Sequence, residues 1–277
     1  MDSFLSSIPS SPNSDIELRD VMKYSVLAGG KRFRPILTYT VASLYDSEIE
    51  KADSCAIAIE LIHIYSLIHD DLPAMDDDDM RHNQPANHKV FGEAQAILAG
   101  DGLQALAFSL ISSDPLVGSE TKIKLMKLLA KSSYDMAEGQ SIDLSVVSQK
   151  VDLNILDQMH KKKTGALLNC SIIFGALLND ASEGDLSTLE SFADHVGLAY
   201  QIQDDVLDVT TSDEVMGKRQ NSDVIKNKPS YPSIIGLDES IKTFENLYQS
   251  ALDELSNLSV DSKPLRILVK RLMSRTF

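Results

Sequence analysis

Apolar residues recur at spacings of three and four along most of the chain, which is the period of a helix packed against other helices. In the segment 53–70, Ala56, Ile59 and Ile62 follow this spacing with few helix breakers between them. The alternating patterns and tight-turn pairs typical of strands are missing. The same helical pattern predicts helices over 53–70, 94–112, 120–144, 152–179, 186–208 and 239–257. Because these segments are long and apolar around much of their circumference, the sequence predicts an all-α bundle.

Polar breaks separate the predicted helices, and the two longest cover residues 72–93 and 210–233. Loops of this length in a compact domain are usually functional or disordered. Each begins where a helix ends in clustered aspartates. The Ser-, Pro- and Asn-rich residues 1–14 are expected to form a loose leader. The length predicts one large domain over 15–277 and leaves two compact domains open.

Composition narrows the classes of function. A hydrophobic fraction of 43% is too high for a disordered protein. The formal net charge of −15 argues against nucleic acid and anionic membranes as partners. Two cysteines give no disulfide framework, the first residues carry no signal-peptide pattern, and no stretch approaches the roughly 20 apolar residues of a membrane span. We therefore expect a cytoplasmic protein without a membrane partner.

Six aspartates crowd into the ten residues 70–79 of the segment HDDLPAMDDDD, which starts at His69. Such a run is most often a solvated acidic loop. Two observations argue against that interpretation here. Asp70 and Asp71 end an apolar helix, where carboxylates are unfavourable against the C-terminal dipole, and a second aspartate cluster follows later in the chain.

The second cluster is the segment QIQDDVLD, residues 201–208. In a helix, positions 201, 204, 205 and 208 share one face. Three carboxylates among apolar neighbours are unfavourable unless a cation compensates them. The donors are oxygens without a nearby Cys or His pair, and Mg²⁺ is commonly held by carboxylates together with substrate phosphates. Two such clusters, facing each other, would hold several Mg²⁺ ions with a diphosphate between them.

Basic residues stand at glycine-containing breaks in the segments 28–35 (AGGKRFRP), 161–165 (KKKTG) and 217–219 (GKR). A Walker A loop is excluded, since Ser25 and Arg32 stand where that motif requires Gly and Ser or Thr. Each run alone is more often a solvated turn. In so acidic a chain, three of them favour counter-charges for an anionic substrate.

These motifs, in this order, resemble those of the trans-isoprenyl diphosphate synthases, most closely the bacterial farnesyl diphosphate synthase type. The resemblance runs from about residue 19 to 235 and includes four residues between the first aspartate pair and Asp76. It implies an all-α bundle of ten or more helices around a deep cavity, and usually a homodimer. It also implies head-to-tail condensation of isopentenyl diphosphate with dimethylallyl or geranyl diphosphate to give the C15 product. The C10 and C20 synthases of the family stay open as alternatives.

The resemblance assigns roles residue by residue. It implies three Mg²⁺ ions, bound by Asp70, Asp71, Asp76, Asp204, Asp205 and Asp208. The allylic diphosphate would be held by Arg81, Lys163, Thr164, Gln201, Lys218 and Lys228. Isopentenyl diphosphate would be held without metal by Lys31, Arg34 and His63. Catalysis would rest on the residues Asp70, Asp71, Asp76, Lys163, Asp204 and Lys218. Gln140 and Asp143 also fit the family, and supporting roles are expected for them.

Product length is expected to depend on Tyr65, with Ser66 beside it. Tyr65 precedes Asp70 by five residues, roughly 7.5 Å along a helix, so its ring would floor the cavity for the growing chain. The alternative is that Tyr65 only packs in the core. His63 likewise has a structural alternative, because a lone histidine on an apolar helix is more often a core residue.

Three positions depart from the family pattern. His82-Asn83 follows Arg81 where a second arginine and a glycine are usual, Asn221 replaces a glycine, and Pro229 follows Lys228. A largely neutral His82 is a weak substitute for a bidentate arginine, and Arg271 or Arg275 is a possible replacement. Two other functions stay open: a non-catalytic synthase subunit, which would lack the aspartates, and a class I terpene cyclase, which would not need a second diphosphate pocket.

Overall fold

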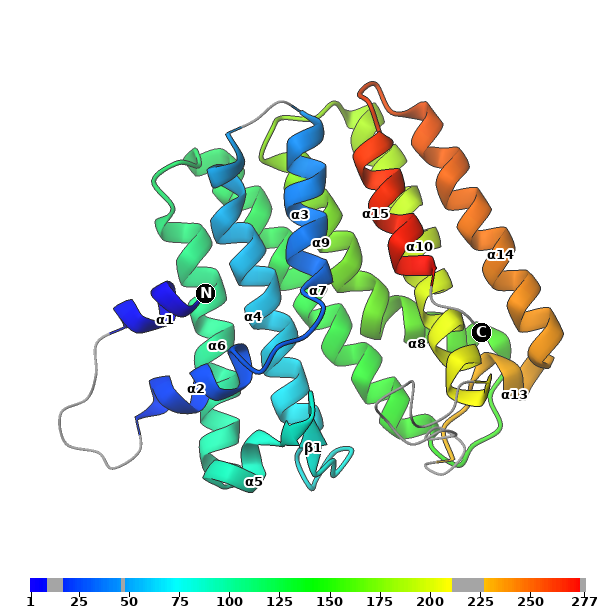
Figure 1. Cartoon of the computed structure of the whole chain (residues 1–277), viewed down its shortest axis with the longest axis horizontal. Helices are drawn as coiled ribbons and strands as arrows, with labels where there is room; N and C mark the ends of the chain where they lie inside the picture. Colours follow the sequence, from blue (N-terminus) through cyan, green and yellow to red (C-terminus); the bar gives the residue numbers. More distant parts are fainter. Residues whose placement is uncertain (9–16, 46–47, 211–226, 275–277) are drawn as a thin grey trace. The chain divides into compact units, whose positions relative to one another are not determined.

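The computed structural model describes residues 1–8, 17–45, 48–210 and 227–274, and helices form most of this part of the chain (Figure 1). The predicted all-α class is confirmed. The exception is a two-residue antiparallel ladder within the break 72–93, in which β1 (Met80–Arg81) pairs with β2 (Gln84–Pro85). The chain divides into two compact units, and the predicted single domain over 15–277 stays a prediction. The first comprises Met1–Ile36 and Asp53–Met126, and the second Leu37–Ala52 and Lys127–Phe277.

The first unit is built on two long helices that pack along each other, α4 (Asp53–Asp70) and α6 (Glu93–Ser113). α4 is buried on most sides, as its nearly continuous apolar sequence predicts. The unit also contains α1 (Asp2–Ser7), α2 (Leu18–Val26), α5 (Asn87–Phe91) and the starts of α3 (Phe33–Leu44) and α7 (Ser119–Val146). α2 packs on both long helices, and Tyr24 and Ser25 near its end line a pocket together with Asp71, which follows α4.

In the second unit α10 (Glu183–Thr210) is the central helix, and it contacts helices from most of the unit. The unit holds most of α3 and α7. Its other elements are η1 (Ile49–Ala52), α8 (Leu153–His160), the π-helix η2 (Lys161–Gly165), α9 (Ala166–Leu177), α13 (Tyr231–Ile235), α14 (Leu237–Glu254), η3 (Leu255–Asn257) and α15 (Lys263–Met273). The segment predicted as one helix over 152–179 is thus interrupted by a π-helical turn.

The N-terminal residues differ from the expected loose leader. Asp2–Ser7 form α1, and Leu5 of this helix is fully buried. Lys23 of α2 lies 3.4 Å from the Asp2 carboxylate and donates to Ser6. The rest of the expected leader, from residue 9 onward, lies outside the described residues.

Two helical stretches are long and apolar enough to cross a membrane by length and composition, namely Ile49–Asp70 and Glu93–Ser113. The prediction that no stretch approaches this limit is therefore wrong for these two. The first is mostly buried inside the protein, as a core helix is, but the apolar window of the second is only 33% buried. The expected absence of a membrane partner stays a prediction.

Candidate active site

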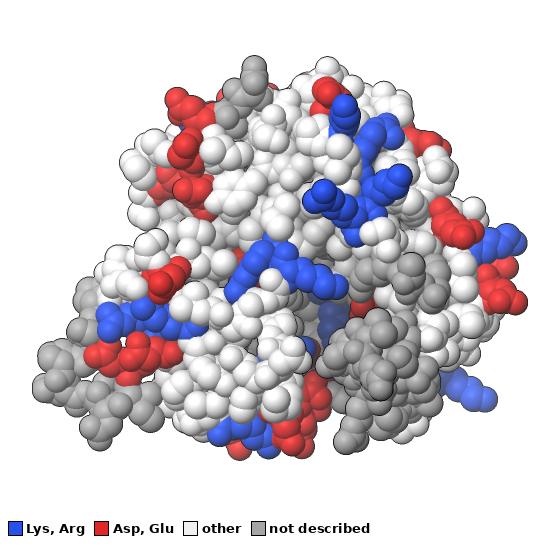
Figure 2. Space-filling model, in the orientation of Figure 1, with Lys and Arg blue, Asp and Glu red and all other residues white. Residues whose placement is uncertain are grey.

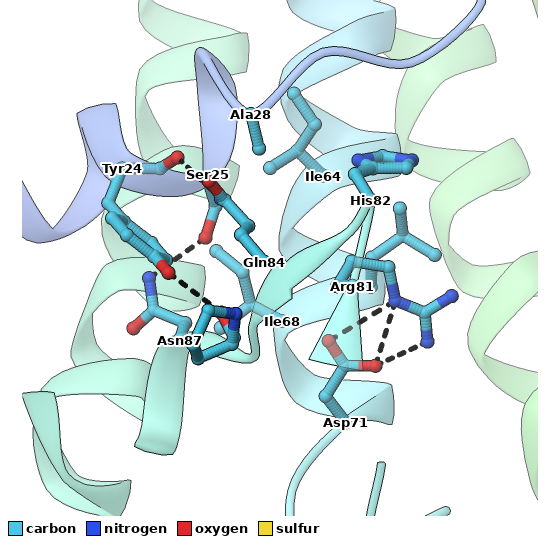
Figure 3. A pocket seen from close by; sticks show the side chains of 12 residues that line it. Tyr24, Ser25, Ala28, Ile64, Ile68, Asp71, Arg81, His82, Gln84 and Asn87 are labelled. Atoms are coloured by element: carbon cyan, nitrogen blue, oxygen red, sulfur yellow. Dashed lines mark hydrogen bonds and ion pairs between the residues drawn. The ribbon is translucent and has the colours of Figure 1, made fainter. Parts of the chain in front are cut away.

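The first aspartate cluster begins at the end of α4, where the Asp71 side chain is almost fully buried. Arg81 on β1 reaches back to this carboxylate and donates from Nε to Oδ1 at 3.0 Å, with a second contact from Nη2 (Figure 3). Burial raises the pKa of Asp71, and Arg81 opposes that rise. The Asp76 amide donates to the Asp70 carbonyl at 2.9 Å, so the loop turns back on the helix end. The first unit thus brings Asp70, Asp71, Asp76 and Arg81 together.

The later aspartates of this cluster are more exposed and pair with cations. Asp79 lies 2.6 Å from the Lys89 ammonium, and Asp78 lies 3.6 Å from Arg81. For Asp77 to Asp79 the solvated acidic loop is therefore an adequate description, whereas it does not describe the buried Asp71.

Four cationic or imidazole side chains gather beside the first cluster. His63 has its pKa held well below the usual value, first by burial and then by the nearby charges of Arg34 and Arg81 and the His82 ring. The His82 ring also lies against Gly30, where a Cβ would be 3.4 Å from it. Burial lowers the pKa of His82 as well, followed by the charge of Arg81. The structure thus brings together three of the residues predicted to bind isopentenyl diphosphate, Arg34, His63 and His82. The fourth, Lys31, is exposed and lies three residues before Arg34 in the sequence.

Arg32 and Glu60 also belong to this region, and sequence reasoning missed their role. Arg32 donates to the buried Glu60 carboxylate at 2.6 Å and to the Val26 carbonyl. It therefore ties the GGKRFRP segment to α4 and to the end of α2. The signal was an acidic residue within the apolar helix 53–70, since buried charges are nearly always paired.

A small pocket opens between α2, α4 and the β-ladder (Figure 3). It is lined by Tyr24, Ala28, Ile64, Asp71, Arg81 and His82, among others. Its volume is about 20 Å³, which is space for about one water molecule. The pocket is too small for a prenyl substrate, so the deep cavity implied by the resemblance stays a prediction.

The chain-length residues Tyr65 and Ser66 lie on α4, and Tyr65 contacts α6. Tyr65 is buried, and its hydroxyl accepts a hydrogen bond from Gln104 of α6 at 3.3 Å. Its ring also makes an edge contact with His69, with 5.7 Å between centroids. Ser66 donates to the His63 carbonyl within its own helix. These contacts fit the packing alternative for Tyr65 and leave its role in product length a prediction.

In the second unit, the second aspartate cluster is linked into a hydrogen-bond chain. Thr164 of η2 donates to Gln201 at 3.0 Å, and Gln201 donates to Asp205 Oδ1 at 3.2 Å. The other oxygen of Asp205 accepts from the Tyr231 amide at 3.0 Å and lies 3.4 Å from His160 Nε2. Asp205 is thus engaged by the protein on both oxygens, and its assignment as a metal ligand stays a prediction.

Tyr231 and its neighbours were not predicted from the sequence. The Tyr231 hydroxyl donates to Asp157 of α8, and its ring stacks on His160 with 5.9 Å between centroids. Burial raises the pKa of Tyr231, and the Asp157 carboxylate raises it further. The signal available in the sequence was the Ser-Tyr-Pro turn that follows Lys228 and starts α13.

Two predicted phosphate-binding lysines meet at one carboxylate. Lys163 Nζ lies 2.7 Å and Lys228 Nζ 2.8 Å from the same oxygen, Oδ2 of Asp143 on α7. Lys162 pairs with Glu138 one turn earlier on that helix. Lys218, the third predicted lysine, and Asn221 lie outside the described residues.

The basic C-terminal helix α15 carries Lys263, Arg266, Lys270 and Arg271, and Figure 2 shows Lys and Arg side chains gathered over it. It belongs to the second unit. Arg275 lies outside the described residues, so a replacement of the missing second arginine by Arg271 or Arg275 stays a hypothesis.

The acidic residues suit magnesium in chemistry, since their donors are carboxylate oxygens. Within the described residues, no group of three or more His, Cys, Asp or Glu side chains stands ready to hold a metal ion. Asp71 is held by Arg81, and Asp205 by Gln201 and Tyr231. A metal site that includes Asp71 or Asp205 therefore requires that side chain to exchange partners.

Comparison with known proteins identifies the family. The model of the family described as polyprenyl synthetase matches residues 15–260. The chain belongs to the polyprenyl synthetase family. The resemblance seen in the sequence motifs is therefore confirmed.

Individual members of the polyprenyl synthetase family match over most of the chain. Farnesyl diphosphate synthase of Escherichia coli (strain K12) is 40% identical over 272 residues, covering 95% of this chain and 91% of that protein. Geranylgeranyl pyrophosphate synthase 12 of Arabidopsis thaliana is 40% identical over 265 residues, covering 93% and 73%. The crystal structure of a geranyltransferase from Helicobacter pylori, complexed with magnesium and isoprenyl diphosphate, has a TM-score of 0.81 at 31% identity, covering 98% and 91%.

Proposed function

We propose that this member of the polyprenyl synthetase family is a magnesium-dependent prenyltransferase that makes farnesyl diphosphate from isopentenyl diphosphate and dimethylallyl or geranyl diphosphate. One observation carries the proposal beyond family membership. The first unit holds an aspartate-rich helix end and, beside it, a cluster of Arg34, His63 and His82. Such a cluster suits a second diphosphate bound without metal, which a condensation requires and a terpene cyclase does not.

The reaction begins with cleavage of the allylic C1–O bond, which leaves a delocalised carbocation and a diphosphate anion. Arg81, Lys163, Thr164 and Lys228 bind that diphosphate and stabilise the charge that develops on it, which is where preorganised electrostatics contribute most. The double bond of isopentenyl diphosphate then attacks the cation, and the released diphosphate accepts the proton that is lost. Water must be kept out, since it would quench the cation.

Magnesium, when bound, neutralises the leaving diphosphate and orients it. Among the residues of this chain, Asp70, Asp71 and Asp76 would hold it on one side and Asp204 and Asp208 on the other. Three ions are the expected number. Asp205 is proposed to support this set through its bonds to Gln201 and Tyr231.

The test is incubation of the purified protein with Mg²⁺, isopentenyl diphosphate and each allylic diphosphate (C5, C10 and C15), followed by analysis of product length. We expect C15 from the C5 and C10 substrates. Asp70→Asn is the control variant, because loss of a carboxylate from the first cluster should abolish condensation. Absence of any condensation product would refute the proposal, as would full activity without Mg²⁺. A C20 product would instead assign the geranylgeranyl alternative.

A homodimer is the proposed assembly, with α6 in its interface. Ile97 and Leu98 of this helix are 44% and 49% exposed, and its apolar 18-residue window is mostly uncovered. An apolar helix face of this kind is typical of an interface between protein chains. Light scattering after gel filtration should give twice the chain mass, and Ile97→Lys should lower the measured mass.

We propose the cytoplasm as the compartment, since Cys55 and Cys170 are buried free thiols.

A further inference from the structure

One buried carboxylate gathers two lysines from distant parts of the chain. Asp143 on α7 is only 3% exposed, and its Oδ2 atom lies 2.7 Å from Lys163 Nζ and 2.8 Å from Lys228 Nζ. Lys163 comes from the π-helix η2, and Lys228 from the segment that leads into α13. Two ammonium groups that share one oxygen repel each other, so this arrangement requires the carboxylate between them.

The same face of α7 also holds the backbone of η2. Gly139 lies one helical turn before Asp143, and a Cβ at this position would be 2.6 Å from the Lys163 Cα and closer still to its amide nitrogen. Contact this close is possible only for glycine. α7 thus contacts Lys163 at both ends: Gly139 lies against its backbone, and Asp143 binds its ammonium group. Single π-helical turns are rare and frequently lie at functional sites.

The Asp143 carboxylate is kept in its charged form by the two lysines. Burial alone would raise the pKa of Asp143, but Lys163 and Lys228 outweigh burial and hold the pKa below its usual value. The carboxylate is therefore ionised, and it attracts both ammonium groups. The nearby pair of Lys162 and Glu138 is balanced and more exposed, as is usual for surface ion pairs.

We propose that Asp143 is a positioning residue that holds Lys163 and Lys228 side by side, so that both donate to one phosphate group of the allylic substrate. The proposal deepens the proposed function, on which it rests for the identity of the substrate. Asp143 itself does not touch the substrate. Its effect is to bring two cations to one point before the substrate arrives, which lowers the cost of ordering them during binding.

Removal of the Asp143 charge distinguishes positioning from simple repulsion. If Asp143 only opposed a bound phosphate, Asp143→Asn would tighten phosphate binding, because one negative charge beside the lysines would be removed. If Asp143 positions the lysines, the same variant weakens binding. The two roles therefore predict changes of opposite sign in one measurement.

The experiment is calorimetric titration of the full chain with inorganic pyrophosphate and Mg²⁺, for the natural protein and for Asp143→Asn. We expect about a tenfold loss of affinity, the size typical when a residue that orients a binding group is removed. Glu138→Gln, which removes the carboxylate that pairs with Lys162 on the same helix, is the matched control and should change affinity by less than about twofold. Unchanged or tighter pyrophosphate binding by Asp143→Asn would overturn the proposal.

A double-mutant cycle and steady-state kinetics keep the test independent of folding. In a Lys163→Gln, Lys228→Gln background, Asp143→Asn should cause no further loss of affinity, whereas an undiminished loss would overturn the proposal. Asp143→Glu, which keeps the charge, should recover part of the affinity if Asp143→Asn folds poorly. In Asp143→Asn, KM for the allylic substrate should rise more than KM for isopentenyl diphosphate. Equal rises of the two KM values would overturn the proposal. Pyrophosphate binding by a natural protein that makes no product would count against the proposed function alone.

Discussion

Arg81 holds the buried Asp71 carboxylate through Nε, at 3.0 Å from Oδ1, and through Nη2. One residue is expected to bind the allylic diphosphate and the other to bind magnesium. In this arrangement the Arg81 guanidinium occupies the Asp71 oxygens that would bind magnesium, and the Asp71 carboxylate occupies the Arg81 N–H groups that would bind the diphosphate. Hydrogen bonds between a guanidinium and a carboxylate are among the stronger polar contacts in proteins, so binding of metal and substrate must compete with them.

Arg81→Gln should separate these two effects. Without the guanidinium, Asp71 loses its competitor, and affinity for Mg²⁺ alone should rise several-fold. Affinity for the allylic diphosphate should fall, because a hydrogen bond to a charged group is worth about 1.5–3 kcal/mol, or roughly 10- to 150-fold. Calorimetry with Mg²⁺ and kinetics with geranyl diphosphate measure the two changes. Lys89→Gln, which removes the exposed partner of Asp79, is the control. Unchanged Mg²⁺ affinity in Arg81→Gln would show that Arg81 does not restrain Asp71.

Tyr65→Ala should lengthen the product beyond C15, because removal of the ring opens space on the face of α4 five residues before Asp70. Tyr65→Phe is the matched control, since it keeps the ring and removes only the hydrogen bond from Gln104. Product analysis should give C15 for the natural protein and Tyr65→Phe, and C20 or longer for Tyr65→Ala. The same product length in all three would assign Tyr65 to packing alone.

His82→Arg should lower KM for isopentenyl diphosphate by about tenfold, because a permanent charge replaces a ring that is largely neutral at pH 7. The pKa of His82 lies below its usual 6.5, first through burial and then through Arg81 and Arg32. The ring therefore gains its proton only below pH 6.5. As pH falls through this range, KM should decrease in the natural protein relative to His82→Arg, which is charged throughout. An unchanged KM in the variant would indicate that another cation, such as Arg271, supplies the charge.

The helical pattern of the chain was sufficient to predict most of the long helices. The segments 53–70, 94–112 and 120–144 correspond to α4, α6 and α7 within a few residues. The apolar spacing of each helix lies within its own segment, so it can be read from the sequence for the mostly buried α4 and also for α6, whose apolar window is only 33% buried. The π-helical turn in 152–179 could not be predicted in this way, because its lysine- and glycine-containing sequence carries no distinct period.

The candidate site was predicted in its residues but not in its contacts. Aspartate and lysine motifs are local signals, and a family resemblance gives their expected roles. Their partners are set by tertiary packing: Asp143 meets Lys163 and Lys228 from 20 and 85 positions away. The pairing of Arg81 with Asp71 depends on the two-residue ladder that turns the chain back. A strand of two residues is too short to show an alternating pattern in the sequence.

Gly139→Ala should displace η2 from α7, because the added methyl group would overlap the Lys163 backbone, which cannot move aside as a flexible side chain can. Overpacking of this kind typically costs about 1–3 kcal/mol of the free energy of unfolding. Gly184→Ala is the matched control, since its Cβ would meet only the Ser182 hydroxyl at 3.7 Å, in the first turn of α10. That change should be neutral or slightly stabilising, because alanine is the better helix former. Denaturant unfolding measures the free energies, and pyrophosphate titration reports the displacement of Lys163. A Gly139→Ala protein as stable as Gly184→Ala, with unchanged pyrophosphate affinity, would contradict the close contact between α7 and η2.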